Sequence, residues 1–293
     1  MKGDVVVVVG DVMNDVVVRA LGPFEAGSDT GSEIRRSPGG SGANQAAWLA
    51  TLGVPVRFYG RAGVSDLGEH AAALLRSGVD ARLAADLELP TGSIVVLVEE
   101  GGERSMYTDR GANTRLGDAD LPADLRGVAH LHVSGYALFD PGTRPAVAGL
   151  VARAIGERVP VSTDPSSVSY LREMDPERFL ALTAGAETIF PNAAEAGLLT
   201  GRRDVHEAAQ VLAESYPTVV VKLGRDGALL ARRGAPPVRV DALCVTVVDT
   251  TGAGDAFCAG YLAARWGGAG PEQAVHAAVG ASAQVTARMG GRP

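Results

Sequence analysis

Short apolar runs alternate with longer amphipathic segments along the 293-residue chain. Runs that predict β-strands occur at 5–9, 56–60, 93–98, 128–135, 159–164, 187–192 and 218–224. Several are apolar throughout, which is typical of strands buried on both faces of a parallel sheet. Helical patterns lie between them, at 42–52, 66–77, 143–156, 193–200, 204–215, 254–266 and 271–288. The alternation predicts an α/β three-layer sandwich with a mostly parallel central sheet, whose ligands bind beyond the carboxyl ends of the strands.

Two segments interrupt this alternation. Residues 12–38 and 92–112 contain short alternating runs with no helical pattern between them. We expect them to form a small β-sheet outside the main sheet, which acts as a lid over a binding site. Because no stretch is rich enough in Pro or Gly to separate two units, we expect residues 1–293 to form a single domain.

Composition excludes several classes of protein. Hydrophobic residues make up 46% and charged residues 21%, which excludes a largely disordered chain. The net charge of -7 argues against nucleic acid or an anionic membrane as the main partner. No apolar run approaches the ~18 residues of a membrane helix, and the start of the chain is typical of a strand, so we expect a cytoplasmic protein. Cys244 and Cys258 lie among apolar residues and are predicted to be buried free thiols.

The stretch DTTGAGDAF, residues 249–257, combines a glycine-rich turn with a carboxylate. Gly252, Ala253 and Gly254 precede a helical pattern, so their backbone N–H groups are predicted to form an anion site at a helix N-terminus. Asp255 falls in the first turn of that helix. It either complements the helix dipole or acts as a general base beside a phosphate, as phosphoryl transfer to a hydroxyl requires.

Two other phosphate-binding architectures do not fit. A Walker loop needs Gly-Lys-Ser/Thr, and neither Lys2 nor Lys222 precedes Ser or Thr. The first strand is followed by a single glycine, which leaves a Rossmann oxidoreductase as a weaker alternative. Lys222 is the only interior lysine and ends a predicted strand, so we consider for it a charge role near phosphate.

Five motifs occur in one order along the chain: GDVMND (10–15), GGSGANQAAWLATLG (39–53), PNAAE (191–195), KLGRDG (222–227) and DTTGAGDAF (249–257). Together they resemble the motifs of the PfkB (ribokinase-like) carbohydrate kinase family, in the family's order. Five ordered motifs are far more specific than any one of them. The resemblance implies an ATP- and Mg²⁺-dependent kinase that phosphorylates a sugar hydroxyl, with Asp255 as its base.

Candidate substrate residues follow from the first two motifs and the lid. Asp11 and Asp15 follow the first strand at the edge where ligands bind, although Asp is also common in turns. By resemblance, Asp15, Gly40 and Asn44 contact the sugar; for Asn44 the alternative is hydrogen bonding at the helix start. Arg110 on the lid is either a solvated surface residue or a clamp on the substrate.

Candidate nucleotide and magnesium residues come from the later motifs. Asn192 and Glu195 lie one turn apart at a helix start, which is typical of a capping box. By resemblance the same pair holds hydrated Mg²⁺, and the two roles are compatible. Gly224 and Gly227 either form a plain hairpin turn or, by resemblance, bring nucleotide phosphate and ribose against the backbone. Thr250 is assigned to the nucleotide on the same grounds.

The resemblance implies two further sites. Asp249 and Thr251, with carbonyl groups near Ala287 and Gly290, are candidates to hold a monovalent cation such as K⁺. The nucleotide base is expected between the loop at 238–245 and the last helix.

The sequence leaves the substrate open. Ser41 stands where ribokinases of the family commonly have Lys, which weakens the case for ribose. We expect a neutral ribose- or fructose-type sugar, with a 2-keto-3-deoxygluconate kinase or a nucleoside kinase as alternatives. In the acid-sugar case, Arg110 would pair with the substrate carboxylate. A non-catalytic sugar- or nucleotide-binding regulator is a further alternative, against which Asp255 and the anion turn argue. We also expect a homodimer formed through the β lid.

Overall fold

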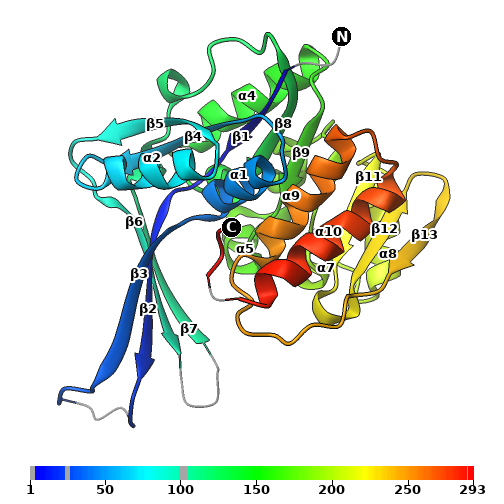
Figure 1. Cartoon of the computed structure of the whole chain (residues 1–293). Helices are drawn as coiled ribbons and strands as arrows, with labels where there is room; N and C mark the ends of the chain where they lie inside the picture. Colours follow the sequence, from blue (N-terminus) through cyan, green and yellow to red (C-terminus); the bar gives the residue numbers. More distant parts are fainter. Residues whose placement is uncertain (1–3, 24–26, 99–103, 289) are drawn as a thin grey trace.

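The central feature of the computed structural model is a nine-stranded sheet (Figure 1). The structure describes residues 4–23, 27–98, 104–288 and 290–293. The strand order is β13-β12-β11-β10-β9-β8-β1-β4-β5. The bounds are β1 (Val5–Val9), β4 (Val56–Gly63), β5 (Asp80–Asp86), β8 (Val128–Ser134), β9 (Val161–Asp164), β10 (Thr188–Ile189), β11 (Thr218–Lys222), β12 (Ala228–Arg232) and β13 (Ala235–Val240). Neighbours from β5 to β11 pair in parallel, and only β12 and β13 add antiparallel pairs, so the predicted sheet type is confirmed.

Helices cover both faces of this sheet. One face packs against α1 (Ser41–Thr51), α2 (Leu67–Arg76), α9 (Ala253–Trp266) and α10 (Pro271–Thr286). The other packs against α3 (Tyr136–Phe139), α4 (Arg144–Gly156), α5 (Val168–Met174), α6 (Pro176–Leu182), α7 (Ala193–Thr200) and α8 (Val205–Ala213). Val6 and Val8 of β1 point into the first core, whereas Val7 and Val9 point into the second, as the two-residue period of a strand requires. The predicted three-layer sandwich is confirmed. Of the helices in the described ranges, none is long and apolar enough to cross a membrane.

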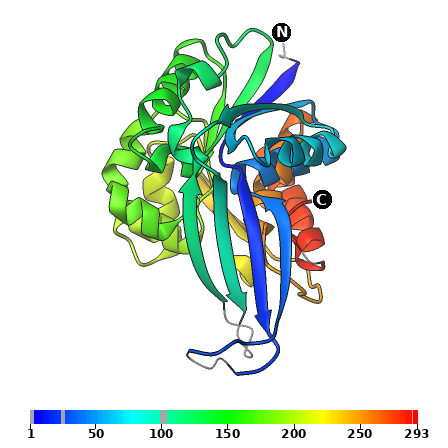
Figure 2. The same ribbon diagram turned by 90° about the vertical axis from the view of Figure 1, so that its left-hand side faces the viewer.

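A second, four-stranded sheet projects from the body as a lid (Figure 2). Its order is β3-β2-β6-β7, with bounds β2 (Met13–Ala20), β3 (Ser32–Gly39), β6 (Thr91–Val98) and β7 (Arg104–Gly111). These strands match the segments in which the sequence predicts a separate sheet. Within those segments, residues 24–26 and 99–103 lie outside the described part of the chain.

The two cysteines differ in their surroundings. Cys258 is buried on α9, as predicted, but Cys244 is exposed, so the prediction for Cys244 is wrong. Cys244 lies between β13 and α9, in a segment where Leu243 and Val247 are also exposed, at 57% and 61%. These side chains line a cavity rather than the core, and an apolar cavity wall has the same sequence pattern as a core segment.

Candidate active site

Polar residues gather at the carboxyl ends of the parallel strands. Asp11 follows β1, Tyr136 follows β8, Asp164 ends β9, Asn192 follows β10 and Lys222 ends β11. The order of strands reverses at β1, because β4 and β5 lie on one side of it and β8 to β11 on the other. Open α/β sheets bind ligands at such a point.

The predicted anion turn is present at the start of α9. Gly252 is the N-cap and has φ 74°, a left-handed conformation that favours glycine. A Cβ atom at this position would also lie 2.5 Å from Cα of Gly291, so only glycine fits there. Ala253 and Gly254 begin the helix. The Ala253 N–H donates to the carbonyl oxygen of Thr250 at 3.2 Å, whereas Gly254 and Asp255 lie in the first turn, whose N–H groups have no intrahelical acceptors. This backbone suits a bound anion.

Asp255 is held by two side chains of α1. Ser41 Oγ donates to Asp255 Oδ1 at 2.6 Å, and Asn44 Nδ2 donates to Oδ2 at 3.1 Å. Burial raises the pKa of Asp255 to about 7, against the opposing effect of these two hydrogen bonds. A carboxyl that exchanges its proton near neutral pH suits a general base. Gly40, and not Asn44, is the N-cap of α1, and the Asn44 side chain donates to Asp255 and accepts from Arg292.

The glycine pair before α1 brings the lid against the body. A Cβ atom on Gly39 would lie 2.1 Å from Asp15 Oδ2, and one on Gly40 would lie 2.5 Å from the carbonyl oxygen of Asp11. Gly40 also has φ 97°. These contacts place Asp15, on β2, beside the start of α1. Burial raises the pKa of Asp15 to about 7, although Arg292 opposes the rise.

Arg110 is largely buried, with only 13% of its side chain exposed. Its Nη1 is 3.3 Å from Asp11 Oδ2, and its Nη2 donates to the carbonyl oxygen of Tyr136 at 3.2 Å. The guanidinium also covers the Tyr136 ring, 4.9 Å from its centroid. Asp11 Oδ1 in turn accepts from the Gly42 N–H at 3.0 Å. Arg110 therefore does not point into solvent, and Asp11 connects it to the start of α1.

Lys222 lies under the anion turn. A Cβ atom on Gly254 would be 3.5 Å from Lys222 Nζ, which places the ammonium group beside the turn as the charge role requires. Lys222 Nζ donates to both carboxylate oxygens of Asp164. Burial alone would lower the pKa of Lys222, but the charge of Asp164 outweighs it and the pKa is raised.

Asn192 and Glu195 form the predicted capping box at the start of α7. Asn192 N donates to Glu195 Oε2 at 2.8 Å, and Glu195 N donates to Asn192 Oδ1 at 2.9 Å. Glu195 is 2% exposed, and burial raises its pKa to about 7. Among the described residues, no group of three or more His, Cys, Asp or Glu side chains is arranged to bind a metal.

A cavity of about 540 Å³ adjoins the anion turn. Ligand sites commonly have volumes of about 300–1,000 Å³. Its wall includes the predicted nucleotide residues Lys222, Gly224, Gly227 and Thr250, and Gly254 of the anion turn. The rest of the wall is mostly apolar and includes Leu243, Cys244, Val245, Val247, Phe257 and Val279. The segment after β13 and helix α10 thus face each other across it, where the nucleotide base is expected.

The two glycines of the KLGRDG motif differ in the reason for their presence. Gly224 has φ 59° and no atom within 4 Å of a Cβ position, so its backbone faces open space. Gly227 has φ 87°, and a Cβ atom there would lie 2.0 Å from the carbonyl oxygen of Val240. Packing against β13 therefore requires Gly227, whether or not a nucleotide is bound.

Asp249 and Thr251 lie together with the C-terminal segment. Asp249 Oδ1 accepts from the backbone N–H and the hydroxyl of Thr251, at 2.9 and 2.7 Å. Asp249 Oδ2 accepts from the Gly290 N–H at 3.0 Å. The residues predicted to surround a monovalent cation are therefore neighbours in space.

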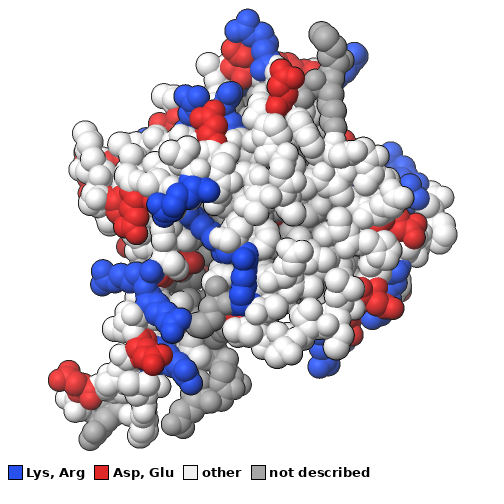
Figure 3. All heavy atoms as spheres, viewed as in Figure 1, with Lys and Arg blue, Asp and Glu red and all other residues white. Residues whose placement is uncertain are grey.

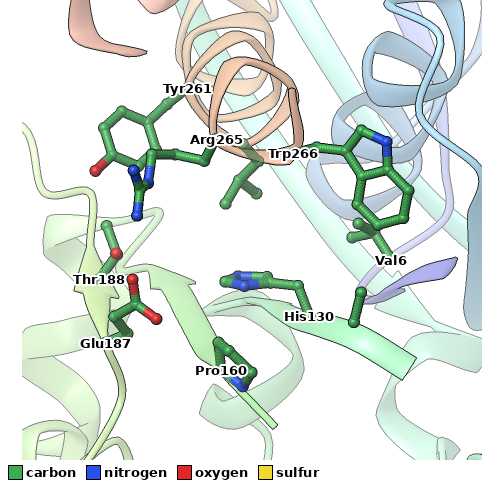
Figure 4. Close-up of a pocket in the computed structure, with 10 residues that line it drawn as sticks. Val6, His130, Pro160, Glu187, Thr188, Tyr261, Arg265 and Trp266 are labelled. Atoms are coloured by element: carbon green, nitrogen blue, oxygen red, sulfur yellow. The ribbon is translucent and has the colours of Figure 1, made fainter. Parts of the chain in front are cut away.

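A smaller cavity, of about 160 Å³, lies at the opposite edge of the sheet. Figure 4 shows His130, Glu187, Tyr261, Arg265 and Trp266 around it, with the helix at the top being α9. These residues come from the amino ends of the parallel strands and the C-terminal end of α9. Asp255 and the anion turn are at the other end of that helix, so we assign the chemistry to the carboxyl edge.

Several residues of the site were not predicted from the sequence: Ser41 as a partner of Asp255, and Gln45, Asn113, Asp164 and Arg292. Asn113 donates to the carbonyl oxygens of Val12 and Arg110 and accepts from the Val12 N–H, which connects the lid to β1. Its position directly after the lid, in DRGAN, was a usable signal. Arg292 lies far along the chain from every other member of the sugar site, and nothing near it in the sequence signals its role.

A nine-stranded α/β body, a lid sheet, and a partly buried carboxylate behind an anion turn define a phosphotransferase that acts on an alcohol group. The family model for pfkB family carbohydrate kinases matches residues 4–293. The chain belongs to this family, as its ordered motifs predicted.

Individual relatives differ in the substrate that their names give. The chain is 34% identical to a fructokinase of Klebsiella pneumoniae over 86% of this chain and 82% of the relative. It is 30% identical to an ATP-dependent ribose-1-phosphate kinase of Halopiger xanaduensis over 97% and 92%. The crystal structure of adenosine kinase from Sinorhizobium meliloti superposes with a TM-score of 0.88 at 27% identity, covering 100% of this chain and 96% of that one. Family membership therefore establishes a sugar or nucleoside kinase and leaves the acceptor undecided.

Proposed function

We propose that this chain uses ATP and Mg²⁺ to phosphorylate a hydroxyl group of a small neutral sugar of the ribose or fructose type. The observation that carries the proposal is the position of Asp255. It lies between the turn at Gly252–Gly254 and the polar cluster at Asp15 and Asn44. A hydroxyl bound by that cluster and a phosphate bound by that turn would both be within reach of its carboxylate.

In this proposal Asp255 removes the proton from the attacking hydroxyl. The N–H groups of Gly254 and Asp255, together with Lys222, stabilise the charge that develops on the transferring group. Mg²⁺ neutralises nucleotide charge when it is bound, and Asn192 and Glu195 would hold its water shell. Thr250, Gly224 and Gly227 line the nucleotide side of the cleft.

On the acceptor side, Asp15 and Asn44 hydrogen-bond the sugar hydroxyls, and Gly40 allows the backbone to approach the sugar. Asp11 contributes to the sugar site mainly by holding Arg110, because both carboxylate oxygens of Asp11 already accept hydrogen bonds from the protein. That ion pair favours a neutral sugar, since an acid sugar would have to compete with Asp11 for the guanidinium of Arg110.

The surface charge is consistent with an anionic cosubstrate. Although the chain has a net charge of -7, Figure 3 shows Lys and Arg side chains gathered where the lid meets the body. The part of this face over α9 and α10 is mostly uncharged. A local positive field of this kind raises the rate at which anions reach a cleft.

The experiment is a coupled ADP-release assay with ribose, fructose, 2-keto-3-deoxygluconate, ribose 1-phosphate and nucleosides as acceptors. We expect Mg²⁺-dependent turnover with a neutral pentose or hexose. Asp255→Asn should reduce kcat by ~10²–10⁴-fold, the usual contribution of a general base. Turnover by the Asn variant at the wild-type rate would exclude Asp255 as the base, and preference for an acid or phosphorylated sugar would exclude the neutral substrate.

We also propose that residues 1–293 act as one kinase domain that dimerises through the lid and binds K⁺ beside Asp249 and Thr251. Ile34, Met106 and Tyr107 on the lid strands are 61%, 60% and 65% exposed, an apolar surface that a second copy would cover. Light scattering of the wild type and of Met106→Glu tests the dimer. Activity in K⁺ compared with tetramethylammonium salts tests the cation.

A further inference from the structure

Arg292 reaches from the C-terminal segment to the residues at the start of α1. Figure 1 places the C-terminal end of the chain beside α1, next to the lid. Arg292 Nε donates to Asn44 Oδ1 at 3.1 Å, and Arg292 Nη2 donates to the carbonyl oxygen of Gly39 at 2.9 Å. Both acceptors belong to the GGSGAN motif, whose Ser41 and Asn44 side chains also donate to Asp255. The guanidinium is thus fixed within the cluster to which the proposed function assigns the sugar.

The segment that carries Arg292 is anchored independently. Trp48 Nε1 donates to the carbonyl oxygen of Gly291 at 2.9 Å, and the guanidinium of Arg288 lies over the Trp48 ring at 4.8 Å. Gly291 also packs against Gly252, the N-cap of the anion turn. Arg292 is therefore preorganised by contacts that do not involve its own side chain, as a binding residue should be.

One nitrogen of Arg292 has no partner in the described part of the chain. Its Nη1 is shielded from solvent and, among the residues that the structure describes, no acceptor lies within hydrogen-bonding distance of it. A buried donor without an acceptor costs about 1–3 kcal/mol, more when it is charged. Such a group is explained when a ligand supplies the missing acceptor.

We infer that Arg292 is a substrate-binding residue, whose Nη1 donates a hydrogen bond to an oxygen atom of the sugar. This inference rests on the proposed function and adds a residue to its sugar site. The oxygen belongs to a hydroxyl group, because Asp15 and Asp255 already face the charge of Arg292 and an additional anion is not needed. An oxyanion of an acid or phosphorylated sugar could accept the same bond, and the experiment separates these sources.

The same guanidinium orients Asn44. Arg292 Nε donates to the Asn44 amide oxygen, so the amide nitrogen Nδ2 is the group that faces Asp255. Without Arg292 the amide could rotate and turn its oxygen towards the carboxylate. Arg292 therefore supports both the bound sugar and the donor that holds the base.

The test is direct calorimetric binding of each acceptor named above, and of ATP analogue with Mg²⁺, to the wild type, Arg292→Gln, Arg292→Lys and Arg288→Gln. We expect Arg292→Gln to weaken binding of a neutral sugar tenfold or more while nucleotide affinity changes less than twofold. Arg292→Lys should recover little, because Lys lacks the planar fork that grips Asn44 and Gly39 together. Arg288→Gln loosens the same segment without removing the donor, and should change sugar affinity less than threefold.

Four outcomes would overturn the inference. Arg292→Gln could bind the sugar as tightly as the wild type, or Arg288→Gln could weaken binding equally, which would assign the effect to the segment and not to the donor. If Arg292→Gln weakened the binding of acid or phosphorylated sugars only, the acceptor of the Nη1 hydrogen bond would be an oxyanion and not a hydroxyl group. If the wild type binds no acceptor at all, the proposed function fails as well, which distinguishes that case from the others.

Discussion

The ammonium group of Lys222 lies 2.9 Å from both carboxylate oxygens of Asp164, next to Gly254 of the anion turn. The side chains are 15% and 4% exposed, so the pair is largely removed from water. Gln45 and Cys258 add weaker contacts to Asp164 at 3.4 and 3.5 Å. A buried ion pair therefore lies next to the phosphate site. Its two residues end β9 and β11, and only β10 lies between these strands in the sheet.

Breaking this pair should cost more than removing both partners. Lys222→Met leaves the Asp164 carboxylate buried without its cation, a change worth about 3–5 kcal/mol. Lys222→Met/Asp164→Asn removes the unpaired charge and should recover part of that loss. Urea unfolding of the wild type, both single variants and the double variant measures the coupling. Additive losses in the double variant would show that the two groups do not stabilise each other.

The position of Asp255 could be predicted from sequence because its signals are local. The glycines before it, the helix after it and the ordered motifs all lie within short windows, as do the capping residues Asn192 and Glu195. The partners that tune the site are different, because they depend on how distant elements pack. Nothing near Asp164 or Arg292 indicates that the first meets Lys222 or that the second meets Asn44. The exposure of Cys244 could not be predicted for a related reason. An apolar segment that lines a cavity has the same composition as an apolar segment in the core.

The raised pKa of Asp255 predicts a pH profile. A general base works when it is ionised, so kcat should fall as the pH is lowered through about 7, the pKa to which burial raises Asp255. Asp15 has a similar pKa and could produce the same limb. The profile should therefore be repeated with Asp15→Asn at saturating sugar. If the acidic limb disappears in that variant, the titrating group is Asp15 and not the proposed base.

The same pKa predicts a trade-off between function and stability. Folding raises the pKa of Asp255 from 3.8 to about 7, so burial favours the protonated form and stability is lost as the pH rises through 7. A shift of about 3 units corresponds to roughly 4 kcal/mol at pH values above 7. Asp255→Asn, which cannot ionise, should be more stable than the wild type at pH 8 and gain little at pH 4. Equal melting-temperature differences at the two pH values would contradict this expectation.

The capping box gives Glu195 a structural role that must be separated from magnesium binding. Glu195→Gln keeps an oxygen that can accept from the Asn192 N–H, so helix α7 should remain capped and the melting temperature should change by only a few degrees. Loss of the negative charge should shift the Mg²⁺ activation curve to higher concentration. An unchanged Mg²⁺ curve would leave Glu195 with the capping role alone.

Cys244 offers a test of nucleotide placement that needs no turnover. It is exposed on the wall of the 540 Å³ cavity, whereas Cys258 is buried and its thiol pKa is raised by burial. A thiolate-selective reagent such as DTNB should therefore modify Cys244 first, because reaction requires both access and ionisation. An ATP analogue with Mg²⁺ should slow this modification at least tenfold by filling the cavity, while the sugar alone should not. Cys244→Ser should lose the fast phase, which identifies the thiol. A fast phase that persists at saturating nucleotide would show that the nucleotide binds away from the segment between β13 and α9, and the assignment of Gly224, Gly227 and Thr250 to its site would fail with it.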